Sequence, residues 1–281
     1  MEQSMLHEIS DILDNLKRVK PLVHHITNYV TANDCANVVL AIGASPVMAD
    51  DPEEVEEIVS LSRALVINLG TLNKRSAESM LKAGKKANEL GIPVILDPVG
   101  AGATSYRSRT AEEIIQNVKL AVIRGNMSEI KAIAGLDAST RGVDASEQDV
   151  NTSKDLWYAK NICVNLSRKL GCVIAITGTT DIVSDGRKTV FIRNGDKMFS
   201  STTGTGCMCT SLIGTFCAVC DDYVTAASAG ILALCISGEK AVEKLTQTDS
   251  GSGSFRTYLI DSVFGLRGGD FMERGKIDVS I

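Results

Sequence analysis

The sequence lacks a basic excess and has no block of like charges. Of its 281 residues, 29 are Lys or Arg and 34 are Asp or Glu, which gives a formal net charge of -5 at pH 7. A protein that holds nucleic acid through its phosphates needs a basic surface, so we expect no nucleic-acid partner. Because the charged residues are scattered along the chain, neither an acidic tail nor a basic arm is expected.

An apolar leader and a long uninterrupted apolar run are also missing. The first twenty residues are amphipathic and mixed in charge, which predicts no signal peptide. Residues 198–220 and 223–238 carry no charge, but Ser, Thr and Gly interrupt both, and two aspartates separate them. This pattern favours two buried helices of a protein core over membrane spans, so no membrane association is expected.

The eight cysteines form no CxxC pair and no Cys/His metal spacing. So many thiols without such motifs indicate a reducing compartment, and we expect a cytoplasmic protein. No internal repeat, low-complexity tract or linker divides the chain, which favours one domain over residues 1–281.

The apolar pattern predicts an α/β fold with a mostly parallel central sheet and helices on both faces. An opening helix is expected from Met5 to Leu16, and a second helix over 33–42, ending at Gly43. Short apolar runs then alternate with helical patterns, which is typical of buried parallel strands and their crossover helices. Strands are predicted at 46–49, 64–69, 93–96, 120–123 and 172–176, and helices at 52–62, 74–90 and 127–134.

The second half of the chain departs from this rhythm. Asp185-Gly186 and Asn194-Gly195 stand among β-forming residues, so a β-hairpin excursion is expected over 182–199. The polar stretch 135–151 predicts a surface loop, and beyond Cys207 the pattern predicts helices alone.

The most informative segment is Thr202–Cys207, with the sequence Thr-Thr-Gly-Thr-Gly-Cys. It leads into an apolar helical run, so several free backbone N–H groups and the helix dipole would favour an anion at one spot. Gly204, Thr205, Gly206 and Cys207 would form this anion hole, although Gly/Thr loops also serve as ordinary turns.

Polar residues at predicted strand ends strengthen the phosphate interpretation, because ligands of open parallel sheets bind beyond the carboxyl ends of the strands. Asp97 opens the motif Asp-Pro-Val-Gly-Ala-Gly. Its carboxylate is well placed to bind Mg²⁺ or the waters of Mg²⁺, and the alternative is a structural aspartate in a turn or at a helix N-cap. Arg124 ends the next predicted strand, and its planar guanidinium suits a phosphate.

The residues after these strands complete the pattern. Asn126 and Glu129 have the spacing of a helix capping box, and Glu129 is also placed to orient a metal-bound water. Thr177 follows the strand at 172–176 and offers a hydroxyl to a phosphate. Phosphoryl transfer depends mainly on positioning and charge neutralisation, so the combination indicates a nucleotide-dependent kinase.

The order of these motifs resembles the ribokinase-like superfamily. In sequence order they are Asp-Pro-Val-Gly-Ala-Gly, Arg-Gly-Asn-x-x-Glu, Ile-Thr-Gly and Gly-Thr-Gly-Cys. His-His-Ile-Thr-Asn-Tyr-Val at 24–30 and Ala-Ser-Pro-Val-Met-Ala at 44–49 narrow the resemblance to the hydroxyethylthiazole kinases. These thiamin-salvage enzymes phosphorylate the hydroxyethyl group of a methylthiazole. The resemblance spans nearly the whole chain, through Ser-Phe-Arg at 254–256.

The resemblance implies a role for each motif. Asn28, Val30 and Met48 would line the thiazole site, with Gly204 beside it. ATP would be contacted by Arg124 and Thr177, with Asn126 from the same loop as a further candidate, and Asp97 and Glu129 would serve the Mg²⁺ region. The family is trimeric, so a homotrimer with thiazole sites between neighbouring subunits is expected.

Cys207 stands where most ribokinase-like kinases place an aspartate base. A free thiol with a pKa near ~8.5 is mostly protonated at neutral pH. The helix N-terminus would lower that pKa, whereas bound ATP would raise it again. We therefore expect Cys207 to aid phosphoryl transfer without dominating it.

Three other functions are compatible with the sequence. One is a kinase of another small heterocyclic alcohol, such as a hydroxymethylpyrimidine. A second is a thiol hydrolase with Cys207 as nucleophile and His24 or His25 as base, although this leaves Asp97 and Arg124 without a role. A third is a sensor that binds a nucleotide or thiazole without catalysis.

The remaining landmarks are expected to be structural. Histidines at positions such as His24 and His25 are more often structural than catalytic, and Trp157, in a helical pattern, is expected to be a packing residue. The stretch 144–160 is longer than the family pattern, and its extra residues are expected in a surface loop.

Overall fold

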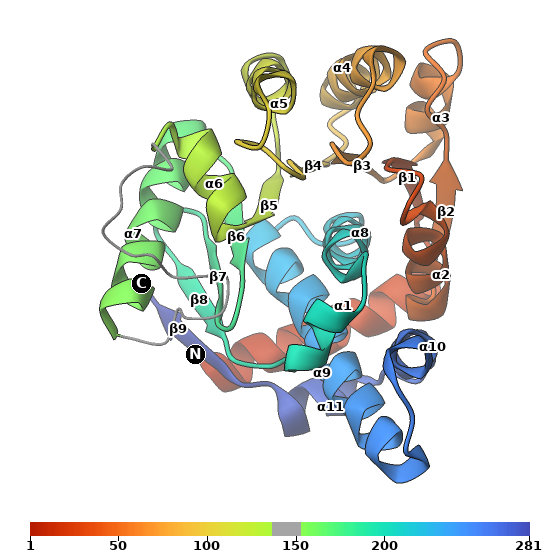
Figure 1. The fold of residues 1–281 in the computed structure, drawn as a ribbon, viewed down its shortest axis with the longest axis vertical. Coiled ribbons are helices and arrows are strands. Elements are labelled where there is room, and N and C mark those ends of the chain that lie inside the picture. Colours follow the sequence, from red (N-terminus) through yellow and green to blue (C-terminus); the bar gives the residue numbers. More distant parts are fainter. Residues whose placement is uncertain (137–152) are drawn as a thin grey trace.

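The computed structural model describes residues 1–136 and 153–281, which form one continuous sheet with helices on both faces (Figure 1). The sheet has nine strands in the order β2-β1-β3-β4-β5-β6-β7-β8-β9. The strands β2, β1, β3, β4, β5 and β6 run parallel, and the pairs from β6 to β9 are antiparallel. The strands are β1 Leu22–Ile26, β2 Ser45–Met48, β3 Ala64–Asn68, β4 Val94–Asp97, β5 Val122–Asn126, β6 Val173–Thr177, β7 Asp181–Ser184, β8 Thr189–Ile192 and β9 Ile277–Ser280.

Helices cover the sheet in two layers. One face is covered by α3 Val55–Leu61, α4 Lys74–Glu89, α5 Ser105–Asn117, α6 Met127–Ala134 and α7 Ser153–Leu170. The other is covered by α1 Glu2–Val19, α2 Ala32–Ile42, α8 Thr205–Cys217, α9 Tyr223–Thr248, α10 Ser252–Phe264 and α11 Gly268–Arg274, with the 3₁₀ turn η1 Lys197–Ser201 before α8.

Alternation along the parallel strands divides the core into two apolar clusters. In β3, Ala64 and Val66 belong to the cluster under α8 and α9, whereas Leu65 and Ile67 belong to the cluster under α4. Successive side chains of a strand point to opposite faces, so a strand buried on both sides must be apolar throughout. The apolar runs predicted as buried parallel strands are therefore confirmed at β3 to β6, whereas the run at 46–49 forms the edge strand β2, which is only partly buried.

Helix α8 lies close against the sheet. A Cβ atom at Gly214 would lie 2.5 Å from Val66 Cγ2, so this close approach requires a residue without a side chain. The contact fixes the axis of α8 across β3 and β4 and thereby places the helix N-terminus at the carboxyl ends of those strands.

The register of the parallel strands brings polar residues together at that edge. Asn68 is the partner of Asp97 across β3 and β4, and Asn126 is the partner of Thr177 across β5 and β6. Paired residues of neighbouring parallel strands point to the same side of the sheet, so each pair presents its side chains together.

Several sequence predictions are wrong in detail. The segment 22–26 forms the strand β1, which was not predicted because two histidines obscure its apolar pattern. The chain beyond Cys207 ends in the strand β9, although only helices were predicted there. The strand β5 extends to Asn126, so Arg124 lies within the strand instead of ending it.

Three further differences concern the second half of the chain. The hairpin consists of β7 and β8, with its turn at Asp185-Gly186, and Asn194-Gly195 leads into η1 instead of a second turn. Helix α7 begins at Ser153, so the end of the stretch assigned to a loop is helical. Trp157 is 68% exposed and is not a packing residue. Most of the loop predicted over 135–151 lies outside the described residues.

Helix α9 is the one described helix that is long and apolar enough to cross a membrane by length and composition alone. Its most apolar 18-residue window is 83% buried inside the protein, between α8 and α10. This burial agrees with the prediction of a core helix for residues 223–238.

Candidate active site

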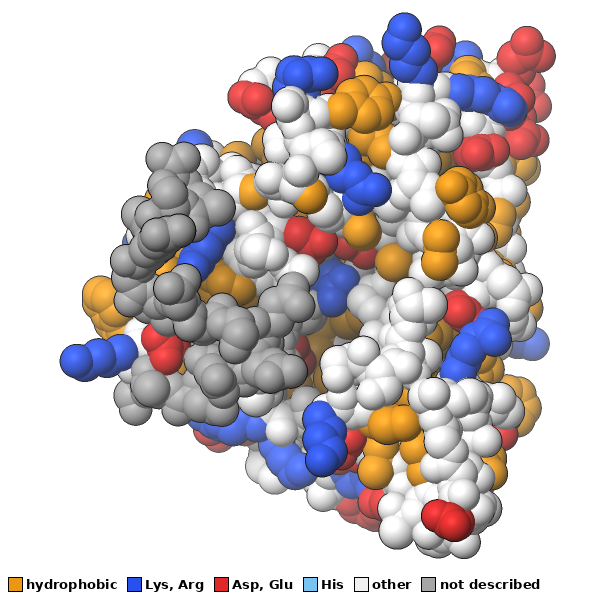
Figure 2. Space-filling view, in the orientation of Figure 1, with side chains coloured by type: hydrophobic (Ala, Val, Ile, Leu, Met, Phe, Trp, Pro, Cys, Tyr) orange, Lys and Arg blue, Asp and Glu red, His pale blue; other side chains and the backbone are white. Residues whose placement is uncertain are grey.

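A pocket of about 400 Å³ opens at the carboxyl ends of the central parallel strands, where α8 begins. Near the middle of the face in Figure 2, acidic and basic side chains meet in a hollow. The residues that line the pocket come from six separate segments of the chain. They are Asn28, Val30, Thr31, Gly70, Thr71, Asp97, Val99, Arg107, Arg124, Asn126, Glu129, Thr203, Gly204, Gly206 and Cys207.

The N-terminus of α8 forms one wall of the pocket. Gly204 is the N-cap residue, with φ of 86°, a conformation that favours glycine, and a Cβ there would lie 2.7 Å from Thr31 Cγ2. The first N–H groups of a helix have no partner within it, and the first turn of α8 contains no acidic residue to compete for them. These N–H groups are the donors that the sequence pattern assigned to an anion hole, and anion binding there stays a prediction.

Asp97 ends β4 at the floor of the pocket and is completely buried. Its Oδ2 accepts hydrogen bonds from Asn68 Nδ2 at 2.9 Å and from Thr210 Oγ1 at 2.8 Å, whereas its buried Oδ1 has no partner among the residues that the structure describes. Burial raises the pKa of Asp97 to about 6, against the nearby positive charge of Arg124. Asp97 therefore contributes to the pocket lining a buried carboxylate with one engaged oxygen.

Arg124 extends from β5 towards Asp97 and Thr177. Its Nη1 lies 3.7 Å from Asp97 Oδ2, and its Nη2 donates a hydrogen bond to the Thr177 hydroxyl at the end of β6. A Cβ at Gly206 would lie 2.7 Å from Arg124 Nη1, so the guanidinium group packs against the first turn of α8. The positive charge therefore lies beside the predicted anion hole. Thr177 itself contributes through Arg124 and does not line the pocket.

Asn126 and Glu129 form the predicted capping box at the start of α6. The Asn126 side chain accepts a hydrogen bond from the Glu129 N–H at 2.9 Å, and Glu129 Oε2 accepts one from the Asn126 N–H at 2.9 Å. Glu129 Oε1 accepts a further bond from the Gly100 N–H at 2.9 Å. The carboxylate is thus held rigidly at the pocket, and it ties the loop after Asp97 to α6.

The Cys207 sulfur lies in the first turn of α8 between two asparagine side chains. It accepts hydrogen bonds from Asn28 Nδ2 at 3.4 Å and from Asn68 Nδ2 at 3.3 Å. Burial and then the charge of Asp97 raise the pKa of Cys207, and the hydrogen bonds only partly oppose this. The helix N-terminus was expected to lower that pKa, but desolvation and the neighbouring carboxylate outweigh it.

The donors of the pocket are compatible with Mg²⁺. The described residues contain no group of three or more His, Cys, Asp and Glu side chains that could hold a metal ion by themselves. Magnesium, however, is usually held through one or two carboxylates together with waters and substrate phosphates. The Oδ1 of Asp97, which has no partner within the described ranges 1–136 and 153–281, fits such a ligand set, with the carboxylate of Glu129 as a second acidic group.

The two histidines before this region are structural. His24 and His25 are buried in β1, where His24 Nε2 lies 2.8 Å from the carbonyl oxygen of Ala49 and His25 Nδ1 lies 3.0 Å from that of Val23. Burial lowers the pKa of both, that of His25 to about 4. Within the described residues, the side chains bonded to Cys207 are the amides of Asn28 and Asn68 and the Thr31 hydroxyl and include no imidazole, so the geometry does not support a Cys-His pair.

Of the remaining candidates, only Val30 lines the pocket. It is 57% exposed. Met48 ends the edge strand β2 and does not line the pocket, and Thr205 follows Gly204 in the first turn of α8.

Sequence reasoning missed several residues of the site. Asn68 and Thr210 bind Asp97, and Arg107 lines the pocket while donating to the carbonyl oxygen of Val99 at 2.7 Å. A polar residue at the end of the apolar run 64–69 was a usable signal for Asn68. Arg107 and Thr210 lie within helices, and their sequence carries no comparable signal.

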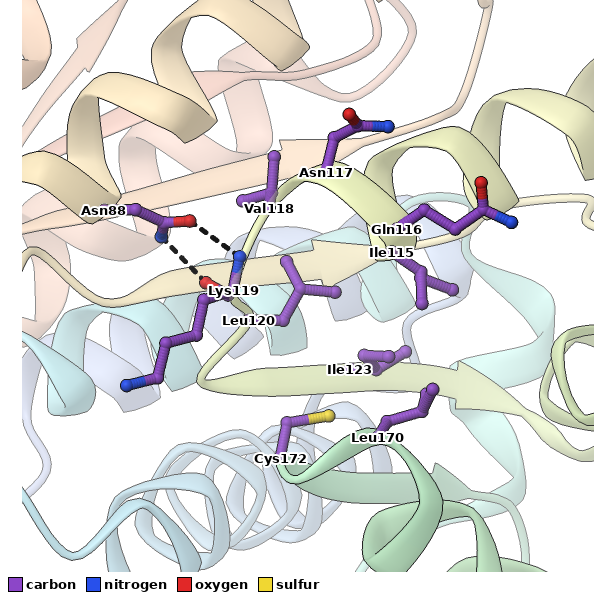
Figure 3. Close-up of a pocket in the computed structure, with 10 residues that line it drawn as sticks. All are labelled: Asn88, Ile115, Gln116, Asn117, Val118, Lys119, Leu120, Ile123, Leu170 and Cys172. Atoms are coloured by element: carbon purple, nitrogen blue, oxygen red, sulfur yellow. Dashed lines mark hydrogen bonds between the residues drawn. The ribbon is translucent and has the colours of Figure 1, made fainter.

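A second cavity of about 400 Å³ lies between α4, α5, β5 and α7 (Figure 3). The Asn88 side chain in its wall has a structural role, because both ends of the amide bind the backbone of Lys119. Asn88 Oδ1 accepts a hydrogen bond from the Lys119 N–H at 2.6 Å, and Asn88 Nδ2 donates one to the Lys119 carbonyl oxygen at 2.9 Å. No residue predicted from the sequence as functional lines it.

The fold and the polar strand ends define a class of protein. A ribokinase-like superfamily protein from Enterococcus faecalis superimposes with a TM-score of 0.57 at 13% identity, covering 90% of this chain and 94% of that one. The described fold is accordingly ribokinase-like.

Closer relatives narrow the class. The family model for the hydroxyethylthiazole kinase family matches residues 13–268. A hydroxyethylthiazole kinase from Clostridium beijerinckii is 51% identical over 277 residues, which is 99% of each chain. The solved structure of a hydroxyethylthiazole kinase protein from Pyrococcus horikoshii OT3 has a TM-score of 0.86 at 38% identity and covers 97% of this chain and 99% of that one. The chain belongs to the hydroxyethylthiazole kinase family.

Proposed function

We propose that the protein transfers the γ-phosphoryl group of ATP to the hydroxyl of 5-(2-hydroxyethyl)-4-methylthiazole, a step of thiamin salvage. One observation carries the proposal: the N-terminus of α8, the Arg124 guanidinium and the buried Asp97 carboxylate meet in one pocket. Family membership adds support for the substrate, since relatives about half identical to this chain are named as hydroxyethylthiazole kinases.

The proposed reaction is direct attack of the substrate hydroxyl on the γ-phosphoryl group. The free N–H groups at Gly204–Cys207 and the Arg124 guanidinium would stabilise the negative charge on the transferring group. These donors are fixed before substrate arrives, because Gly206 packs against Arg124 and Thr177 holds the other side of the guanidinium group. Asn126, beside Arg124 at the end of β5, is a further candidate contact for ATP.

The hydroxyl of the substrate would lie near Cys207, with Asn28 and Val30 around the thiazole ring. Because its pKa is raised, the Cys207 thiol stays protonated at neutral pH and is rarely available as a base, so we assign it a supporting role in orienting the substrate hydroxyl. Asp97, with a pKa of about 6, is mostly ionised at pH 7 and lies on the other side of Asn68.

Magnesium would be held by Asp97 and Glu129 together with the phosphates of ATP. Bound there, it would neutralise part of the phosphate charge. The contribution of this chain is to keep both carboxylates rigid, through Asn68 and Thr210 at Asp97 and through the capping box at Glu129.

We further propose a homotrimer of single-domain chains, each spanning residues 1–281, in the cytoplasm and without nucleic-acid or membrane partners. Tyr29 is 81% exposed and Val30 57% exposed, beside the pocket. Met48, on the edge strand, is 38% exposed. A neighbouring subunit would cover these apolar groups and complete the thiazole site. Light scattering should give three times the monomer mass, and Val30→Asp should lower both that mass and the affinity for the thiazole alcohol.

The decisive experiment is ADP release with a panel of alcohols, comprising the hydroxyethyl methylthiazole, a hydroxymethylpyrimidine and pyridoxal. The proposal requires the highest kcat/KM for the thiazole alcohol, with strict dependence on ATP and Mg²⁺. A higher kcat/KM for the pyrimidine would replace the assigned substrate by the alternative heterocycle. Binding of the thiazole without ADP release would indicate a sensor, and an ATP-independent covalent adduct on Cys207 would indicate a thiol hydrolase.

A further inference from the structure

Asn68 lies buried beneath the pocket and binds through both ends of its amide. Oδ1 accepts hydrogen bonds from the Gly70 N–H at 2.9 Å and from Asn28 Nδ2 at 2.9 Å. Nδ2 donates to Asp97 Oδ2 at 2.9 Å and to Cys207 Sγ at 3.3 Å. The side chain is 1% exposed and does not line the pocket. Its effect on a bound substrate must therefore pass through the groups that it binds, which are its acceptors Asp97 and Cys207 and its donors Asn28 and Gly70.

The orientation of this amide follows from its neighbours. A backbone N–H can only donate, so the Gly70 N–H requires Oδ1 on its side, and the NH₂ group then faces Asp97 and Cys207. The same reasoning applies to Asn28, whose Oδ1 accepts from the Thr31 N–H at 3.0 Å and whose NH₂ group faces Cys207. Two amide groups of fixed orientation thus donate to one sulfur.

The strand register explains why Asn68 reaches both groups. Asn68 and Asp97 are paired residues at the ends of β3 and β4, and α8 crosses these strands with Cys207 in its first turn. Because an amide N–H cannot accept a proton, the bonds fix the sulfur as an acceptor on that side and leave its other side for the pocket. A single side chain therefore bridges the sulfur and the carboxylate.

We propose that Asn68 is a positioning residue for phosphoryl transfer, holding the Cys207 sulfur and the Asp97 carboxylate in fixed relation at the floor of the pocket. The inference rests on the proposed kinase function, which it deepens. Misplacement of a reacting group by about 1 Å can cost about a hundredfold in rate, so loss of this bridge should appear in kcat.

The first test is Asn68→Asp, which keeps the shape and the Oδ1 acceptor but removes both N–H donors. We expect kcat for the thiazole alcohol to fall by about tenfold to a hundredfold, while KM for either substrate changes by less than about threefold. The matched control is Asn88→Asp, because Asn88 also binds through both ends of its amide but lies in the other cavity (Figure 3). The control should lower the Tm without changing kcat. Equal kcat losses in both variants would overturn the proposal.

The second test asks whether Asn68 acts through the sulfur. Asn68→Ala should lower kcat by about tenfold in the parent and by less than about threefold in a Cys207→Ala background, because contacting residues of one network are not additive. The same fold loss in both backgrounds would show that Asn68 does not act through Cys207. Thermal unfolding of each variant confirms that the measured protein is folded.

The third test does not depend on kinase activity. Iodoacetamide labelling of Cys207 at pH 8, followed by peptide mass spectrometry, measures how reactive the sulfur is. In Asn68→Asp a carboxylate oxygen replaces the N–H donor and disfavours the thiolate, so labelling should slow by about tenfold or more. Asn88→Asp should label at the parental rate. An unchanged rate in Asn68→Asp would refute the contact, whereas slower labelling in a protein that releases no ADP would refute only the kinase assignment.

Discussion

The buried carboxylate of Asp181 predicts that a single isosteric substitution makes this protein more stable in alkaline solution. Asp181 begins β7, is 4% exposed, and accepts a hydrogen bond from the Gly178 N–H at 2.9 Å through Oδ1. Cys235 Sγ lies 3.7 Å from Oδ2. Burial raises the pKa of Asp181 from 3.8 to about 7, although the Gly178 bond and the charge of Arg124 oppose the shift. The folded protein therefore holds this proton more tightly than the unfolded chain does.

The sign and the size follow from proton linkage. Because the folded pKa exceeds the unfolded one, the stabilising effect of the bound proton is complete below about pH 4 and is lost as the pH rises through 7. A shift of about three units corresponds to about 4 kcal/mol at 1.36 kcal/mol per unit. Asparagine keeps the acceptor for Gly178 and carries no charge, so Asp181→Asn should raise the free energy of unfolding at pH 8.5 by about 2–4 kcal/mol.

Reversible urea unfolding at pH 8.5 and pH 5 measures this difference. The advantage of Asp181→Asn should shrink by about 2 kcal/mol or more at pH 5, where the folded wild-type carboxyl is already protonated. Asp11→Asn, an exposed change on α1, is the control and should alter stability by less than about 0.5 kcal/mol at both pH values. An advantage that is the same at both pH values, or a variant less stable at pH 8.5, would refute the reasoning.

The remaining predictions concern the pocket. Arg124→Ala should raise KM for ATP far more than the Kd for the thiazole alcohol. It should also lower the free energy of unfolding by about 3–5 kcal/mol, because the Asp97 carboxylate remains buried without its cationic partner. Equal losses of ATP binding and thiazole binding, measured by calorimetry, would contradict this. Cys207→Ala should retain folding and ATP binding and lose about 10²–10⁴-fold in single-turnover rate, and complete loss would mean that the thiol dominates the chemistry. Gly206→Ala, which brings a Cβ within 2.7 Å of Arg124 Nη1, should lower kcat by about tenfold or more with little change in far-UV circular dichroism.

The parallel part of the fold was predictable because its signals are local. Strands such as β3 and β4 are buried on both faces and must be apolar throughout, and their crossover helices carry a separate period. The strand β1 was not predicted because two buried histidines interrupt its apolar run. The strand β9 was not predicted because its partner β8 lies more than eighty residues earlier in the chain. Sequence periodicity carries no information about such a distant partner.

The candidate site was predictable to a similar extent. Asp97, Arg124, Asn126 and Glu129 stand at or near strand ends, which is a position that a sequence can indicate. The pKa of Cys207 could not be predicted, because burial and the charge of Asp97 decide it, and neither is visible along the chain. The helix N-terminus alone suggested the opposite direction.

The sequence by itself determined the alternation of strands and helices, the glycine-rich entry into α8 and the order of the polar strand ends, because each depends on residues close together in the chain. Only the tertiary structure decided which side chains meet. Strand register set Asn68 beside Asp97, and the packing of α8 through Gly214 set Cys207 above both. The contact between Asn68 and Cys207 joins residues 139 positions apart, and chain folding alone fixes such distances.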